Sequence, residues 1–168
     1  MKLELKHLAP YLPYGLMLKI NTPIGIFNRK LQLDCGHDFN LHLSECNIKP
    51  ILRPLSDLTK EIEVNGEKFV PMYKLCKKQG FSMPDSRECE YEFVSKFNQI
   101  ATIKMNGWIF RYLNDEKSFW LNGTESWSKK HQKSNKQLEL FQMLFEWHFD
   151  VFGLIEKKLA IDKNTLNQ

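Results

Sequence analysis

Apolar and polar residues alternate along much of the first third of the chain, and this pattern predicts β-strands. The segments LMLKI (16–20) and IGIFNRKLQLD (24–34) carry apolar side chains at alternate positions, which is the period of a strand with one buried face. Asn-Thr-Pro at 21–23 forms the expected turn between them. FNLHLSECNI (39–48) repeats the alternation as a third strand. The first third is therefore expected to be a small antiparallel meander.

Asn-Gly pairs between apolar runs predict further hairpins. This dipeptide readily adopts the positive φ angles that a tight two-residue turn requires, and it is the strongest short-range hairpin signal. The pairs occur at residues 65–66, 106–107 and 122–123. Together they indicate a substantial antiparallel β component.

Four shorter segments predict helices. The first, residues 3–16, is limited by Pro10 and Pro13, because proline cannot continue the hydrogen bonding of a helix interior. The second is a short turn capped by Ser56 or Asp57, whose side chains can accept a backbone N–H. The four segments are LELKHLAPYLPYGL (3–16), the turn after residue 56, PMYKLCKKQGF (71–81) and RECEYEFVSKFNQ (87–99).

The segment from residue 135 to residue 161 has the clearest helical pattern. Its polar residues recur every three or four positions and form one narrow stripe on an otherwise apolar cylinder. They are Glu139, Gln142, Glu146, Asp150 and Lys157. Gly153 marks the expected break, followed by a second short helix. Such a helix is expected to pack over the sheet as part of the core.

These elements predict an α+β fold, with a hairpin-rich antiparallel β-sheet and C-terminal helices packed on it. We expect one domain over 1–168, because this length is sufficient for a single core. Within it, residues 1–70 are expected to be mainly β, residues 71–134 mixed and residues 135–168 helical.

Composition is that of an ordinary globular protein, with 42% hydrophobic and 26% charged residues. No apolar run is long enough to span a membrane, and early charges interrupt the N-terminus MKLELKHLAPYL, which therefore lacks a signal-peptide core. We expect a cytoplasmic protein without membrane contact. The four cysteines, Cys35, Cys46, Cys76 and Cys89, are then expected to be free thiols.

One stretch combines two cysteines with two histidines: Cys35, His37, His42 and Cys46. Zinc sites usually offer their ligands as two close pairs such as C-x2-C and H-x3-H, and this spacing differs. The same residues fit a hairpin with one buried cysteine and exposed histidines, and we favour that interpretation. The alternative is a zinc site, which would make the protein a metal-dependent enzyme.

No catalytic constellation emerges from the sequence. The phosphate-binding loop, the dinucleotide fingerprint and the G-x-S-x-G nucleophile motif do not occur in it. Glu146 and Asp150 share one face of the predicted helix, whereas His148 points elsewhere, so the three do not form an acid–base site. We therefore expect a non-enzymatic protein that uses neither metal nor cofactor.

The net charge of +4 permits contact with nucleic acid, and the positive charge is concentrated in SWSKKHQKSNK (126–136). In single-stranded RNA binding, lysine side chains neutralise the phosphates, and aromatic rings stack on the bases. A solvated lysine-rich loop is the alternative. The candidate partner-binding or RNA-binding residues are Arg111, Tyr112, Trp120, Trp127, Lys129, Lys130, His131, Lys133 and Lys136.

Three stretches of the chain resemble a family of small proteins carried by prophages. They are MKLELKHLAPYLPYGL (1–16), KPILRPLSDLTKEIEVNGEKFVP (49–71) and LFEWHFDVFGLIEKKLAIDKNTLN (144–167). The family has no enzymatic motif, so the resemblance implies a protein that acts by binding. Within this class, the chain is similar to anti-CRISPR proteins directed against type VI effectors, which are RNA-guided RNA nucleases.

The resemblance implies a phage-encoded inhibitor in the host bacterial cytoplasm. Its partner would be a host CRISPR effector nuclease, with or without its guide RNA, and it would interfere with the handling of guide or target RNA. The alternative is a nucleic-acid-binding accessory protein of phage replication or recombination. Binding to bare RNA or DNA without a nuclease distinguishes this alternative.

Overall fold

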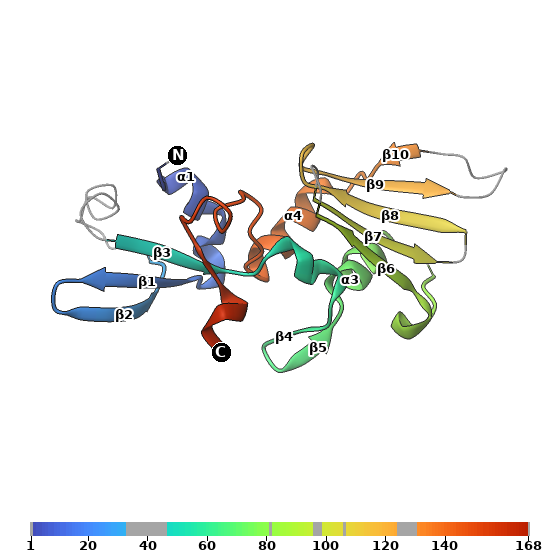
Figure 1. Ribbon diagram of the computed structural model, residues 1–168. Coiled ribbons are helices and arrows are strands. Elements are labelled where there is room, and N and C mark those ends of the chain that lie inside the picture. Colours follow the sequence, from blue (N-terminus) through green and yellow to red (C-terminus); the bar gives the residue numbers. More distant parts are fainter. Residues whose placement is uncertain are drawn as a thin grey trace. The chain divides into compact units, whose positions relative to one another are not determined.

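The computed structural model (Figure 1) describes residues 2–32, 47–80, 82–95, 99–105, 107–123 and 131–167. Within these ranges the fold is α+β with largely antiparallel sheets, as the sequence predicts. The chain forms two compact units. Unit 1 contains residues 1–54 and 144–168, and unit 2 contains residues 55–143. That the whole chain is one domain stays a prediction.

Unit 1 contains a sheet with the strand order β11-β3-β1-β2. β1 pairs antiparallel with β2 and β3, whereas β11 runs parallel to β3. The predicted first hairpin is confirmed, but its turn lies at residues 23–24, because Asn21 and Thr22 pair with β2 as part of β1. Most of the predicted third strand lies outside the described residues. The strands are β1 (Met17–Thr22), β2 (Gly25–Lys30), β3 (Asn47–Leu52) and β11 (Ile161–Asp162).

The N-terminal segment of unit 1 is helical, as expected, and supplies part of the core. It consists of α1 (Leu5–Leu8) and the 3-10 helix η1 (Ala9–Tyr14), which tolerates Pro13 inside it. Tyr11 is fully buried, and its ring lies edge-on to Phe145 with the centroids 5.1 Å apart. Its hydroxyl donates a hydrogen bond of 2.6 Å to the carbonyl of Phe149. The N-terminal and C-terminal segments of unit 1 are thereby joined.

The long C-terminal helix is shorter than the apolar pattern predicts. α4 comprises Gln137–Glu146, and His148 adopts a left-handed φ of 60°. The N–H groups of His148 and Phe149 bond back to the carbonyls of Phe145 and Leu144, which is the Schellman arrangement that ends a helix. The following residues form turns, β11 and the 3-10 helix η4 (Lys163–Asn167). The prediction of a helical segment through 135–161 is therefore wrong beyond Glu146.

A second part of that prediction, which placed Asp150 in the polar stripe of the helix, is also wrong. Its side chain is buried rather than part of a solvated stripe. The two carboxylate oxygens accept the backbone N–H groups of Leu154 and Ile155, each at 2.8 Å. Its own N–H donates to the carbonyl of Arg53 at 2.8 Å. Asp150 thus organises the turns after α4 and ties them to the end of β3.

Unit 2 begins with short elements that largely match the predictions. Asn65 and Gly66 have φ angles of 53° and 83°, so the predicted Asn-Gly turn is confirmed. Residues 71–77 form the expected helix. The elements are η2 (Leu55–Thr59), β4 (Ile62–Val64), β5 (Glu67–Phe69), α3 (Pro71–Lys77) and the 3-10 helix η3 (Ser86–Glu88).

A five-stranded antiparallel sheet with the order β10-β9-β8-β7-β6 and the first part of α4 follow in unit 2 (Figure 1). Gly107, between β7 and β8, has a φ of 78°, as expected for the second Asn-Gly turn. The strands are β6 (Glu90–Val94), β7 (Ile100–Met105), β8 (Trp108–Leu113), β9 (Ser118–Gly123) and β10 (His131–Lys133).

Two sequence predictions fail in this sheet. The segment 87–99 contains strand β6 rather than a helix, because its side chains alternate between exposed and half-buried in register with β7. Asn122-Gly123 is not a turn, since both residues pair with β8 at the end of β9. The turn between β8 and β9 lies at residues 114–117, where Lys117 has a φ of 47°.

The inner face of this sheet is apolar and packs on α4. Phe110 and Phe119 stack with their ring centroids 5.7 Å apart, and Phe141 of α4 meets the ring of Phe119 edge-on at 5.4 Å. Tyr112 joins the same cluster and is fully buried. Burial of these rings stabilises one face of the sheet. The alternate residues of each strand project from the opposite face.

We predict that D150N lowers the free energy of unfolding by about 2–3 kcal/mol. The amide keeps one acceptor oxygen but places an NH2 group against one of the two backbone N–H donors. D162N is the matched control, because the side chain of Asp162 accepts the N–H of Asn164 in a solvent-exposed hydrogen bond. Urea denaturation measures both variants. Equal losses in the two would contradict the anchoring role of Asp150.

His148 makes stability depend on pH. Its Nε2 lies 2.9 Å from the carbonyl oxygen of Tyr14, and burial lowers the pKa of its imidazole from the ordinary value of 6.5. The unfolded chain therefore binds this proton more readily than the folded chain does. The free energy of unfolding should fall as pH decreases from about 7.5 to about 5.5.

H148N removes the titrating ring and keeps a residue type that tolerates left-handed backbone. We expect a flatter pH dependence of the free energy of unfolding, measured by urea denaturation across the same range. Burial also lowers the pKa of His7, so part of the pH dependence of the free energy of unfolding should remain in H148N. Adding H7N to H148N should remove that part. A slope in H148N as steep as in the wild type would contradict the assignment.

Candidate nucleic-acid interface

The outer face of the five-stranded sheet carries a continuous row of mostly polar side chains. Directly opposite residues share a face of the sheet. The pairing of the strands therefore aligns one residue from each of β6, β7, β8, β9 and β10. In order, these are Glu92, Thr102, Arg111, Trp120 and Lys133.

Alternation along each strand determines this arrangement. Phe110, Tyr112 and Phe119 point into the core, so Arg111 and Trp120 point outward between them. Lys133 and Glu92 are exposed, and Arg111 and Trp120 are half-buried. The sequence therefore places one indole ring between two cations on the outside of the sheet. We call these three residues the Arg111–Trp120–Lys133 row.

Trp120 is held in place by its neighbours. Its Nε1 donates to Oγ of Ser118 at 2.9 Å and to Oε2 of Glu116 at 3.2 Å. The ammonium group of Lys133 lies 5.2 Å from the ring centroid and 3.7 Å from the same Glu116 oxygen. These contacts fix the indole on the outer face with a cation beside it, an arrangement that favours binding of anions and planar bases.

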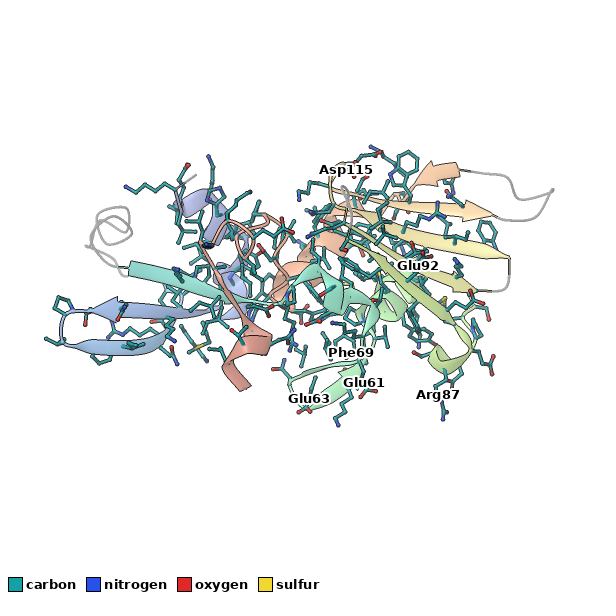
Figure 2. All side chains as sticks on the ribbon, in the orientation of Figure 1. Glu61, Glu63, Phe69, Arg87, Glu92 and Asp115 are labelled. Atoms are coloured by element: carbon teal, nitrogen blue, oxygen red, sulfur yellow. The ribbon has the colours of Figure 1, made fainter. Side chains whose placement is uncertain are left out.

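The opposite edge of the outer face is acidic. Glu90 and Glu92 project from β6, and Glu92 is labelled in Figure 2. Lys104 of β7 lies 4.0 Å from Glu90 and 3.5 Å from Glu92, so one ammonium group is shared between two carboxylates. The outer face therefore has an anionic half at β6 and a cationic half at β8–β10.

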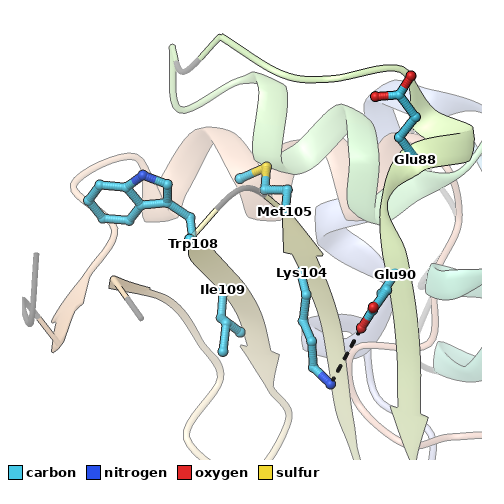
Figure 3. A pocket seen from close by; sticks show the side chains of 7 residues that line it. Glu88, Glu90, Lys104, Met105, Trp108 and Ile109 are labelled. Carbon is cyan, nitrogen blue, oxygen red and sulfur yellow. Dashed lines mark ion pairs between the residues drawn. The ribbon is translucent and has the colours of Figure 1, made fainter. Parts of the chain in front are cut away.

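A shallow pocket of about 250 Å³ adjoins the anionic half, near the turn between β7 and β8 (Figure 3). Two glutamates and the Lys104 ammonium group supply its charges, and Figure 3 marks the pair between Lys104 and Glu90. The apolar part comes from the ends of β7 and β8. Its lining residues are Glu88, Glu90, Lys104, Met105, Gly107, Trp108 and Ile109.

Two residues of the predicted interface belong elsewhere. Tyr112 is fully buried in the core, and its hydroxyl donates to the Asn114 side chain at 3.1 Å, so its ring is not accessible to a base. The ammonium group of Lys136 donates to the carbonyl of Lys78 at 2.7 Å, just after α3. Lys136 therefore ties the start of α4 to the end of α3, and its charge is not part of the outer face.

The structure describes only part of the rest of the lysine-rich segment. Trp127, Lys129 and Lys130 lie outside the described residues. The backbone of His131 belongs to β10 and pairs with Asn122. Of the predicted residues, the structure thus brings together Arg111, Trp120 and Lys133.

The four residues of the zinc alternative also lie outside the described residues, so that alternative stays a hypothesis. They are Cys35, His37, His42 and Cys46. Within the described ranges, no three His, Cys, Asp or Glu side chains converge as metal ligands. Cys76 and Cys89 are free thiols, as predicted. Burial raises the pKa of Cys76 to about 12 and also raises the pKa of Cys89, so both remain protonated near neutral pH.

Sequence reasoning missed Glu116 and Ser118, which orient Trp120. Ser118 lies two residues before Trp120 on the same strand face, and its Oγ also donates to Glu116 at 3.1 Å. The signal was present only as the alternation within β9, and the position of Glu116 depends on the β8–β9 turn, which the sequence did not predict.

No protein-family model, curated protein sequence or solved structure matches this chain. Among the helices that the structure describes, none is long and apolar enough to cross a membrane.

We predict that K136M lowers the free energy of unfolding by about 1 kcal/mol, because it removes the hydrogen bond to the Lys78 carbonyl. K77M is the control, since Lys77 is exposed on α3, and it should change stability by less than about 0.5 kcal/mol. Thermal or urea denaturation compares the two. If K136M proves as stable as K77M, Lys136 has no structural role and belongs again with the binding residues.

Proposed function

We propose that this protein is a non-enzymatic inhibitor that binds a host RNA-guided nuclease and interferes with its handling of guide or target RNA. The resemblance to small prophage proteins supports the biological class. The Arg111–Trp120–Lys133 row is the structural observation that supports the chemistry. It would be the contact surface, and the protein would act by occupying the partner's RNA-handling surface.

The Arg111–Trp120–Lys133 row offers the groups that bind RNA within a protein complex. Arg111 and Lys133 supply positive charge for phosphates, and the indole of Trp120 supplies a flat face for a base or for an apolar pocket. Tryptophan and arginine are also the residue types that most often dominate protein interfaces. Because Trp120 is already oriented by Ser118 and Glu116, binding would lose little side-chain entropy.

The division of charge on the outer face favours a protein–RNA complex over bare RNA. Free nucleic acid is uniformly anionic, so the glutamates at β6 would repel it. A nuclease that holds guide RNA presents both RNA phosphates and the basic protein groups that surround them. The cationic half of the outer face complements the first, and Glu90 and Glu92 complement the second.

Retention of a nuclease on the immobilised protein tests this proposal. Purified type VI effectors, with and without guide RNA, are passed over the wild type and over the variant R111E/K133E. We expect the wild type to retain an effector and R111E/K133E to retain at least about tenfold less, because charge reversal replaces attraction by repulsion. The variant K68E/K77E makes the same change in net charge on exposed side chains and should bind as the wild type does.

Thermal denaturation of each variant separates lost binding from lost folding, and a change of less than about 4 °C in Tm indicates an intact fold. Retention of the effector by R111E/K133E would show that the outer face is not the contact. If no effector is retained and the wild type instead binds bare RNA or DNA in a salt-dependent way, the accessory role in phage replication or recombination replaces this proposal.

A further inference from the structure

Two lysines lie side by side on neighbouring strands of the sheet in unit 1, on the same face. Lys19 of β1 lies directly opposite Lys49 of β3 in the strand register. Such residues have Cβ atoms about 5 Å apart, and like charges at this position destabilise a strand pair. No ion pair of either lysine occurs among the described residues. The arrangement places two cations together without a counter-charge from the described part of the chain.

Among the residues that the structure describes, the neighbours on this face add a further cation and no acid. Lys30 of β2 lies opposite Met17, and Asn28 lies opposite Lys19, so both share the face of the lysine pair. Residues 5–32 and 47–56 contain no aspartate or glutamate. Asp162 of β11 pairs with the fully buried Leu52 and therefore projects from the opposite face. We call this surface the lysine face, formed by Lys19, Asn28, Lys30 and Lys49.

We propose that the lysine face binds a single-stranded nucleic acid through its phosphate groups. A bound polyanion would neutralise the repulsion between Lys19 and Lys49, which the described residues do not. The spacing fits repeated anions, because Lys49 lies about 5 Å from Lys19 across the strands and Lys30 is the diagonal neighbour of Lys19, at about 7–8 Å. Contacts of this kind neutralise phosphates and are independent of base sequence.

The neighbours of the lysines suit a nucleic acid. On β2, Asn28 lies opposite Lys19 and two residues before Lys30, and its amide can bond phosphate or sugar oxygens. At the tip of the β1–β2 hairpin, Ile24 and Ile26 are 88% and 60% exposed. Apolar side chains beside a cationic face can pack on sugars and bases. The hairpin tip would therefore extend the contact beyond the phosphates.

This inference is independent of the proposed function. The lysine face belongs to unit 1, and the Arg111–Trp120–Lys133 row belongs to unit 2. Binding of a probe RNA without any nuclease tests the lysine face alone. The two proposals can therefore fail separately.

Fluorescence anisotropy with a labelled oligouridine RNA of about 20 nucleotides, titrated at several salt concentrations, is the experiment. We expect K19E/K49E to bind at least about tenfold more weakly than the wild type and to lower the salt slope by about 1.4, the loss of two phosphate contacts on a single strand. K68E/K77E, with the same change in net charge, should keep the slope of the wild type.

The single variant K19E guards against a folding artefact. It replaces the Lys19–Lys49 repulsion by an opposite-charge pair, so its Tm should equal or exceed that of the wild type while its RNA affinity falls. Unchanged RNA affinity in both K19E and K19E/K49E would overturn the proposal. The proposal would also be overturned if the wild type bound anionic phospholipid vesicles but not the RNA, and K19E/K49E lost the vesicle binding.

Discussion

Antiparallel pairing in the five-stranded sheet is the constraint on which the account depends. The strands bury one set of side chains in the core, where Phe141 of α4 meets Phe119, and present the alternate set to the other side. Burial of Phe110, Tyr112 and Phe119 therefore decides that Arg111 and Trp120 face outward. A one-residue slip in β8 would exchange the two sets and place the guanidinium group of Arg111 in the core, so the core strongly specifies the register. The position of the proposed interface follows from the packing of the core.

Charge is distributed differently on the two sheets. On the outer face of unit 2, Glu116 and Lys104 partly neutralise their neighbours, and the remaining charges form an anionic half and a cationic half. On the lysine face of unit 1, like charges are adjacent, and the described residues provide no acid to balance them. The first pattern suits a surface of mixed charge, such as a protein that holds RNA, and the second suits a phosphate backbone. The proposed inhibitor of an RNA-guided nuclease would use both.

Local sequence signals predicted elements well where one short stretch decides the structure. The turn at Asn65-Gly66 formed as expected, because two residues with positive φ suffice for it. The identical dipeptide at Asn122-Gly123 lies inside β9, because pairing with β8 outweighs the local preference. The apolar pattern after Glu146 predicts a continued helix, but the left-handed backbone of His148 ends the helix and the buried carboxylate of Asp150 organises turns. Composition alone could not separate Tyr112 from Trp120, or Lys136 from Lys133, since strand register and long-range contacts determine which of them face outward.

Photochemical cross-linking of the bound complex tests the central claim most directly. Ultraviolet irradiation of the protein with a guide-loaded effector, followed by mass spectrometry, identifies the peptides of this chain that touch RNA. The account predicts an RNA adduct on the peptide that contains Trp120, and its disappearance in R111E/K133E. Adducts confined to other peptides, with the Trp120 peptide unmodified in a stable complex, would contradict it.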